Sequence, residues 1–229
     1  MKEGKCMIHD IFHLFFEMFK NQSKYPLPKT KSTFNALVNA IIPRTPETSE
    51  KQGSIQLSEA VASHTDEYEI WSLDHFLSLD ISILNFSIYL ANATAKMLEM
   101  ASKQLIDSKK NKEPINFTIL LEEGAFAALA SNDRFRAITL LEQNKVDITL
   151  LPIPFRNNPG FIFAITGGIA MFATIGYYTE WSGYGSSRMN TPEKRKLEHF
   201  PIGWKQVGYP GPSKGYHAFR GYLVEESTE

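Results

Sequence analysis

An uncharged stretch from Phe161 to Tyr178 constrains the fold of this chain more than any other feature. Its length lies at the short end of what can span a bilayer. A helix that is apolar on all sides is normally either a membrane span or the core of a protein. Thr166, Gly167 and Gly168 within the stretch, and a mean hydropathy of -0.23 for the whole chain, favour a buried core helix.

Glycine, proline and large aromatic residues alternate after this stretch, from Glu180 to Gly185 and again from Phe200 to Tyr216. Glycine opens backbone conformations that other residues avoid, and proline fixes one dihedral. Tyr and Trp each bring a large contact area with one polar tip. The pattern predicts an ordered loop that presents rings to a protein partner, although the same rings can also cover the core. The predicted partner-binding residues are Trp181, Tyr184, Trp204, Tyr209 and Tyr216.

Composition limits the classes of function. The 229 residues are 43% hydrophobic and carry a formal net charge of -1, so the chain can bury a core and lacks the overall basic charge of a nucleic-acid-binding protein. Lys194, Arg195 and Lys196 form a basic cluster that we interpret as a solvated helix face. A single cysteine, Cys6, excludes an intramolecular disulfide framework and a cysteine-based zinc site.

The N-terminal residues do not resemble a secretory signal, because residues 1–10 contain several charges and no twin-arginine pair is present. We therefore expect a cytoplasmic protein, or one exported as a passenger on another protein.

Apolar periodicity predicts a mainly α protein, an irregular helical bundle with a Gly/Pro/aromatic-rich C-terminal segment and few or no strands. An amphipathic helix is expected over residues 8–20 and a proline-containing linker up to residue 31. A second helix is expected from Ser32 to Ile42. The expected organisation is an N-terminal helix and linker over residues 1–31, a helical domain over residues 32–222, and an acidic tail over residues 223–229.

The middle of the chain is predicted to be helical from residue 55 to residue 109, with a turn near residues 72–76 and a sustained helical period from Ile81 to Ile106. Two short helices are expected at residues 125–130 and 133–143, the second capped by Ser131 or Asn132. Residues 146–155 contain two prolines and are at best an edge strand.

No motif indicates catalysis, a metal or a bound cofactor. His9 and His13 have a spacing that a metal could use, but no third ligand is evident, so solvated polar residues are the better interpretation. Glu122 and Glu123 are adjacent and do not face each other on a helix, so we expect them to be exposed or to cap a helix and not to form an acid–base pair. An alternative is a stand-alone enzyme with Glu180 and either His199 or His217 as acid and base. Another alternative is a membrane-associated structural protein anchored through residues 161–178.

Two segments resemble a known family. The helix and Ile-Ile-Pro element over residues 34–45 is similar to the opening of the gluconate 2-dehydrogenase subunit 3 family. The helix from Gly160, the turn Gly183-Tyr184-Gly185, and Trp204 followed by Gly208-Tyr209-Pro210-Gly211-Pro212 resemble its C-terminal motif. The resemblance covers roughly Ser32 to Tyr222.

This resemblance implies a small, non-catalytic subunit that binds and stabilises a large flavin-dependent sugar or polyol dehydrogenase of the glucose-methanol-choline type. It implies that FAD is bound by the partner and not by this chain, and that a cytochrome c subunit can belong to the complex. This chain departs from the family pattern in lacking a twin-arginine signal, and in having residues 45–49 where Pro-Gly-Ala often follows the Ile-Ile-Pro element.

Overall fold

The computed structural model describes residues 26–43, 61–77, 79–81 and 86–211. The helix predicted over residues 8–20, with His9 and His13, lies outside the described residues. So do Tyr216, His217 and the acidic tail.

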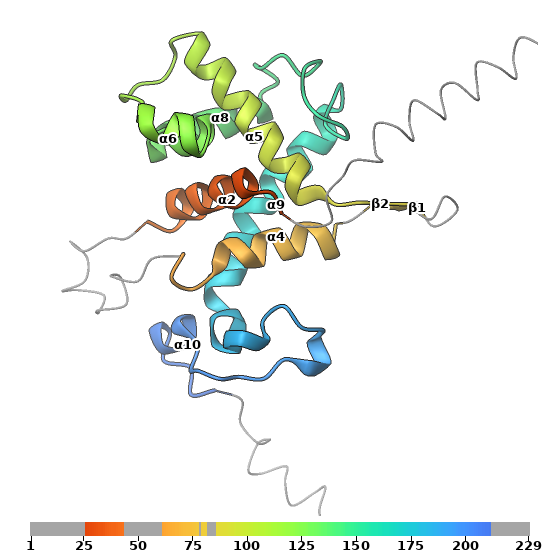
Figure 1. Cartoon of the computed structure of the whole chain (residues 1–229), viewed down its shortest axis with the longest axis vertical. Coiled ribbons are helices and arrows are strands. Elements are labelled where there is room, and N and C mark those ends of the chain that lie inside the picture. Colours follow the sequence, from red (N-terminus) through yellow and green to blue (C-terminus); the bar gives the residue numbers. More distant parts are fainter. Residues whose placement is uncertain (1–25, 44–60, 78, 82–85, 212–229) are drawn as a thin grey trace, which may run out of the picture.

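The described chain is mainly helical, as predicted from its sequence (Figure 1). Its helices are α2 (Pro28–Ile41), α4 (Thr65–His75), α5 (Leu90–Asp107), α6 (Phe117–Glu122), α7 (Ala125–Ala128), α8 (Ser131–Glu142), α9 (Pro159–Tyr178) and α10 (Ile202–Gln206), with 3-10 turns η4 (Glu180–Ser187) and η5 (Pro192–Lys194). Two short strands, β1 (Leu79–Ile81) and β2 (Phe86–Ile88), pair antiparallel with Leu79 opposite Ile88.

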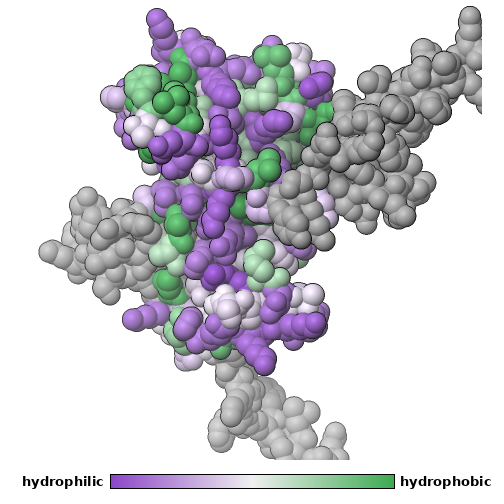
Figure 2. Space-filling view, in the orientation of Figure 1, coloured by the Kyte–Doolittle hydropathy of each residue, from purple (hydrophilic) through white to green (hydrophobic). Residues whose placement is uncertain are grey.

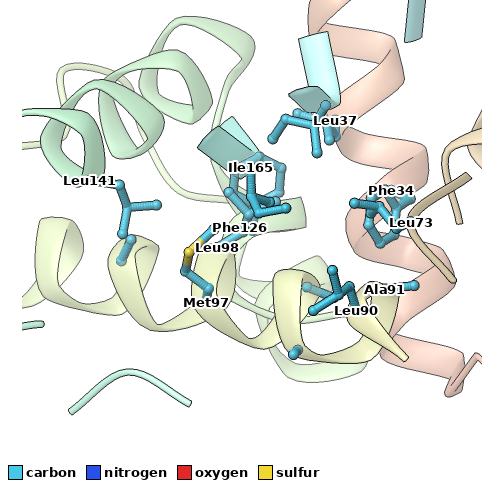
Figure 3. Close-up of a cluster of buried hydrophobic side chains, with 14 of the residues drawn as sticks. Phe34, Leu37, Leu73, Leu90, Ala91, Met97, Leu98, Phe126, Leu141 and Ile165 are labelled. Atoms are coloured by element: carbon cyan, nitrogen blue, oxygen red, sulfur yellow. The ribbon is translucent and has the colours of Figure 1, made fainter. Parts of the chain in front are cut away.

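The main hydrophobic core lies where α2, α4, α5, α7, α8 and α9 converge (Figure 3). Phe34 and Leu37 enter it from α2, and Leu98 enters from α5. Phe126 of α7 and Ile165 of α9 lie beside Leu98 in the middle of the cluster, and all five side chains are almost completely buried. Burial of one such side chain contributes about 1.5–3 kcal/mol, so this cluster is the main source of stability.

Helix α9 is the uncharged stretch identified in the sequence, and it passes behind α2 and α4 in the view of Figure 1. Ile162, Ile165 and Ile169 on one face are buried in the core. The prediction of a core helix is therefore correct for this face. On the opposite face Phe163 is 65% exposed and Met171 is 52% exposed, so burial on all sides, which the composition suggested, does not occur.

Close contact between α4 and α9 depends on Gly176. A Cβ atom added at this position would lie 2.5 Å from the Tyr68 ring of α4. The absence of a side chain therefore lets Tyr68 pack directly on the backbone of α9. By length and composition alone α9 could cross a membrane; in this structure its buried face is part of the protein core.

The visible face of the molecule is mostly hydrophilic (Figure 2). A hydrophobic patch at the upper left lies over α6, where Phe117 is 71% exposed and Leu121 is 81% exposed. Asn116 caps this short helix by accepting hydrogen bonds from the backbone N–H groups of Thr118 and Ile119.

Several predicted boundaries differ from the structure. Helix α2 begins at Pro28 and not at Ser32, because proline is well tolerated in the first turn of a helix, where its missing N–H is not needed. Helix α4 continues through His75, and the turn predicted near residues 72–76 comes at Phe76, at the end of that range. The helix predicted from Ile81 begins only at Leu90. Strands β1 and β2 occupy part of the intervening chain, where apolar residues also alternate with a period of two.

The predicted cap of α8 is also wrong. Ala130 is the N-cap residue, and no side chain caps the helix. Asp133 in the first turn is instead fully buried and accepts hydrogen bonds from the backbone N–H groups of Lys112 and Glu113. Residues 146–155 form turns and no strand.

Helix α4 carries three buried carboxyl groups, Asp66, Glu69 and Asp74, on the side that packs into the protein. The Asp74 Oδ1 atom accepts a hydrogen bond of 2.8 Å from the Ala91 N–H and so caps α5, while burial raises the Asp74 pKa to about 6. Glu69 is fully buried, and neither Oε atom has a hydrogen-bond partner among the described residues. Burial, with a smaller contribution from the charge of Asp66, raises the Glu69 pKa well above its ordinary value.

We predict that Glu69 makes the protein less stable as pH rises. Because its pKa is raised in the folded state, the folded chain holds this proton more tightly than the unfolded chain. The resulting stabilisation is fully present below the ordinary pKa and is lost as pH rises through the raised value. Each unit of difference between the folded and unfolded pKa values is worth about 1.4 kcal/mol.

Urea unfolding of the wild type and Glu69→Gln from acidic to mildly alkaline pH tests this prediction, because the neutral amide cannot titrate. The variant should gain stability relative to the wild type as pH increases. Parallel stability curves for the two proteins would show that Glu69 is not a buried titrating group.

Candidate partner-binding surface

The C-terminal segment, defined here as residues 180–211, packs on the last turn of α9. Helix α10 comes so close that a Cβ atom on Gly203 would lie 2.5 Å from the Tyr177 carbonyl oxygen and 2.6 Å from the Tyr178 Cα. No side chain larger than hydrogen fits there. Gly203 therefore fixes where the aromatic residues on either side of it lie relative to α9.

Internal hydrogen bonds hold this segment in one conformation. The Glu198 carboxylate accepts bonds from the Ser186 N–H at 2.9 Å and from the Ser186 hydroxyl at 2.6 Å. These hydrogen bonds lower the pKa of Glu198. The Gly183 carbonyl accepts bonds from the N–H groups of Glu198 and His199, and the Ser182 hydroxyl accepts one from the Ile202 N–H. The loop predicted from its Gly and Pro content is thus ordered by its own polar groups.

Trp181 lies inside the protein and is 1% exposed. Its indole N–H donates a hydrogen bond of 2.9 Å to the His64 carbonyl, just before α4 begins. The ring also packs edge-on against Tyr68, with centroids 5.2 Å apart. Trp181 therefore attaches the C-terminal segment to α4 and contributes to a partner surface only by positioning its neighbours.

Arg195 is enclosed by three aromatic rings, which we call the arginine cage: Trp71, Trp181 and Tyr184. Its guanidinium carbon lies 4.4 Å from the centroid of Trp71, 5.1 Å from that of Trp181 and 5.7 Å from that of Tyr184. Cation–π attraction at such distances contributes about 0.5–2 kcal/mol. The Arg195 Nε also donates a hydrogen bond to the Asn190 carbonyl.

The interpretation of Lys194, Arg195 and Lys196 as a solvated helix face is wrong for Arg195. The helical part is one 3-10 turn, Pro192–Lys194. It ends before Arg195, where the backbone is extended. The extended backbone directs Arg195 inward, while Lys194 and Lys196 remain exposed.

Glu180 and Tyr184 form a pair at the edge of the arginine cage. The Tyr184 hydroxyl donates a hydrogen bond of 2.9 Å to Glu180 Oε1. Burial, together with this hydrogen bond and the charge of Glu180, raises the Tyr184 pKa to about 12. The phenol is therefore protonated at neutral pH and remains a donor to Glu180, the residue considered above as a catalytic acid or base.

A second group of rings lies at the surface and is called the aromatic cluster: Phe200, Trp204 and Tyr209. The Trp204 ring meets Phe200 edge-on at 5.9 Å and Tyr209 edge-on at 4.9 Å. Phe200 is 54% exposed, Tyr209 is 43% exposed, and Trp204 is half-buried between them. The Tyr209 N–H donates a hydrogen bond to the Trp204 carbonyl, which fixes the turn that joins the two rings.

The aromatic cluster borders an open hollow of about 390 Å³. The hollow is lined by Leu197, Glu198, His199, Phe200, Pro201, Trp204, Pro210 and Gly211. Polar and apolar atoms contribute about equally to this wall. Its rings and prolines can contact the apolar part of a side chain from another protein, and its polar groups can contact a polar tip.

The structure divides the predicted partner-binding residues into two groups. Trp204 and Tyr209 meet in the exposed aromatic cluster, whereas Trp181 and Tyr184 belong to the arginine cage. Tyr216 lies outside the described residues. Phe200 was missed, although its spacing of four residues from Trp204 could have indicated it.

Among the described residues no group of three His, Cys, Asp or Glu side chains could hold a metal ion. Glu122 and Glu123 are exposed at the C-terminal end of α6, in agreement with the expected exposure or helix cap.

We predict that Arg195→Gln destabilises the protein by about 1–2 kcal/mol, because the cation–π contacts of the arginine cage are lost. The matched control is Lys196→Gln, which removes the same charge from an exposed neighbour and should change stability by less than about 0.5 kcal/mol. Urea unfolding followed by tryptophan fluorescence measures both. Equal effects of the two substitutions would contradict the cage.

Comparisons of this chain with protein-family models, with curated proteins and with solved structures find no match.

Proposed function

We propose that this protein is a non-catalytic accessory subunit that binds and stabilises a flavin-dependent dehydrogenase acting on a sugar or polyol. The observation that carries the proposal is the exposed aromatic cluster of Phe200, Trp204 and Tyr209 beside an open hollow. The partner carries FAD and performs the chemistry, and a cytochrome c subunit can complete the complex. These assignments of partner and cofactor rest on the sequence resemblance described above.

The composition of the aromatic cluster supports binding to a protein. Aromatic residues are enriched at interfaces, and a few buried Trp and Tyr anchors typically supply most of the binding free energy. The Phe200 and Tyr209 side chains are each more than two-fifths exposed, and a partner could bury both. Covering them would remove apolar surface from water and place the rim groups of Glu198 and His199 next to the partner.

The order of the C-terminal segment supports the same conclusion. Binding is weakened when loops and side chains must be fixed at the moment of association. The hydrogen bonds of Glu198 and Gly183, together with the arginine cage, fix this segment before any partner arrives. A pre-ordered surface of this kind loses little conformational entropy on docking.

The two segments that carry the family resemblance also pack against each other. Val38 of α2 forms a small hydrophobic cluster with Ala173 and Tyr177 of α9. The opening helix and the C-terminal motif are therefore parts of one folded unit, as expected if both belong to a single subunit scaffold.

We predict that Tyr209→Ala and Trp204→Ala weaken binding of the flavoprotein partner far more than they lower the stability of the isolated chain. Loss of an interface anchor typically costs 2 kcal/mol or more, which is a decrease in affinity of about thirtyfold. The matched control is Met189→Ala, which truncates a side chain that is 63% exposed in the same segment but outside the cluster. The measurement is recovery of the partner with each tagged variant from its own host.

Folding of each variant is checked by circular dichroism, because Trp204 is half-buried. Unchanged partner recovery with folded Tyr209→Ala and Trp204→Ala would contradict docking through the aromatic cluster. Turnover of a substrate by the purified chain, without any flavoprotein, would instead favour the stand-alone enzyme that uses Glu180.

A further inference from the structure

Helix α6 carries the two most exposed large apolar side chains of the described residues, Leu121 and Phe117. They lie four residues apart and therefore on one face of the helix, and we call them the apolar pair. They belong to the hydrophobic patch over α6 in Figure 2. Ile119 packs against the core, while no residue of this helix is fully buried. The outward face of α6 is therefore a candidate interface.

Basic side chains precede α6. Lys109, Lys110 and Lys112 are exposed in the turn that follows α5, and we call this segment the basic turn. Hydrogen bonds fix its backbone, because the Lys110 N–H donates to the Leu105 carbonyl and the Lys112 N–H donates to the buried Asp133 carboxylate. The fold therefore determines where these three positive charges lie relative to α6.

Acidic side chains follow α6. Glu122 and Glu123 are exposed at its C-terminal end. The chain then turns onto the middle of α5, where the Glu99 carboxylate accepts hydrogen bonds from the N–H groups of Ala125 and Phe126. The position of the acidic end is thus fixed as firmly as that of the basic turn.

The two charged groups lie at opposite ends of α6. Glu99 marks the acidic end and Lys109 lies at the basic end, about 15 Å further along α5. Neighbouring charges do not cancel this difference. Glu99 is paired with Lys103 at 3.4 Å, and Glu113 beside the basic turn is a single acid that accepts a hydrogen bond from Asn132. Positive charge therefore remains in excess before the apolar pair, and negative charge remains in excess after it.

A second copy of the chain is complementary to this surface. When a two-fold axis passes through the contact at right angles to α6, the two helices run antiparallel, and the N-terminal end of each faces the C-terminal end of the other. The basic turn of each copy then faces Glu122 and Glu123 of the other, and the two apolar pairs cover each other. Parallel pairing would bring like charges together, which is unfavourable. Charge complementarity thus identifies both the occupant of this surface and its orientation.

We propose that this chain forms a two-fold symmetric dimer through antiparallel contact between α6 of one copy and α6 of another. The apolar pairs form the centre of the interface, and the basic turn and the two glutamates form its rims. Such a small interface implies weak, reversible association, with a dissociation constant of about 10 µM to 1 mM. Helices α6 and α10 lie at opposite ends of the molecule in Figure 1, so the dimer leaves the aromatic cluster free, and the proposal does not depend on the partner.

Sedimentation equilibrium of the full-length chain tests the proposal, in a reducing buffer that excludes a disulfide through Cys6. The average mass should rise with concentration from 26.0 kDa toward twice that value. Leu121→Glu should weaken dimerisation at least about tenfold, because it places a charge in the apolar centre. The matched control is Phe163→Glu, which places the same charge on the exposed face of α9 and should leave the dimer intact.

Charge reversal tests the orientation of the two copies. Glu122→Lys with Glu123→Lys makes both ends of the surface basic, and Lys110→Glu with Lys112→Glu makes both ends acidic. Each double variant alone should be monomeric at concentrations where the wild type is dimeric. An equimolar mixture of the two should form a heterodimer, because opposite charges then face each other at both ends. Circular dichroism checks that both double variants are folded.

Three results would overturn the proposal. A wild-type chain that stays monomeric up to about 1 mM would exclude the dimer. If partner recovery then fell in Leu121→Glu, the surface would belong to the flavoprotein. A dimer lost in Phe163→Glu and kept in Leu121→Glu would place the contact at α9. Folded double variants that form no heterodimer when mixed would exclude the antiparallel contact.

Discussion

The packing of one face of α9 is the interaction on which the rest of this structure depends. Its isoleucines complete the core built by α2, α5 and α7, and Gly176 brings α4 into direct contact with it. The last turn of α9 then supports α10 through Gly203, and so supports the aromatic cluster. A change in the position of α9 would alter the core and the proposed partner surface together.

The sequence indicated this helix and the mainly helical fold because apolar periodicity and the lack of charge are local signals. It did not reveal the single buried face, since a helix of such uniform composition shows no polar side. Residues 79–88 were assigned to a helix because Ile81 and Leu84 fit a period of 3.6, while the alternation that marks β1 and β2 is only a few residues long. The start of α2 was placed four residues too late because its proline was assigned to the linker. Pro28 in fact lies in the first turn of the helix, where proline is well tolerated.

The candidate surface was only partly predictable for a different reason. The Gly, Pro and aromatic content of the C-terminal segment identified the region, but whether a ring faces water depends on tertiary contacts. Trp181 and Trp204 look alike in the sequence, yet one donates to the His64 carbonyl inside the protein and the other lies beside an open hollow. The inward position of Arg195 depends on Trp71, which lies far away in the sequence, so no local pattern could predict it.

We propose that the ordered C-terminal segment docks on a flavin enzyme. Docking can be tested by affinity purification of the tagged wild-type chain from its own host, with mass spectrometry and an absorbance spectrum of the eluate. We expect a large flavoprotein in stoichiometric amount, together with flavin absorbance. A colourless chain recovered without any partner would contradict it.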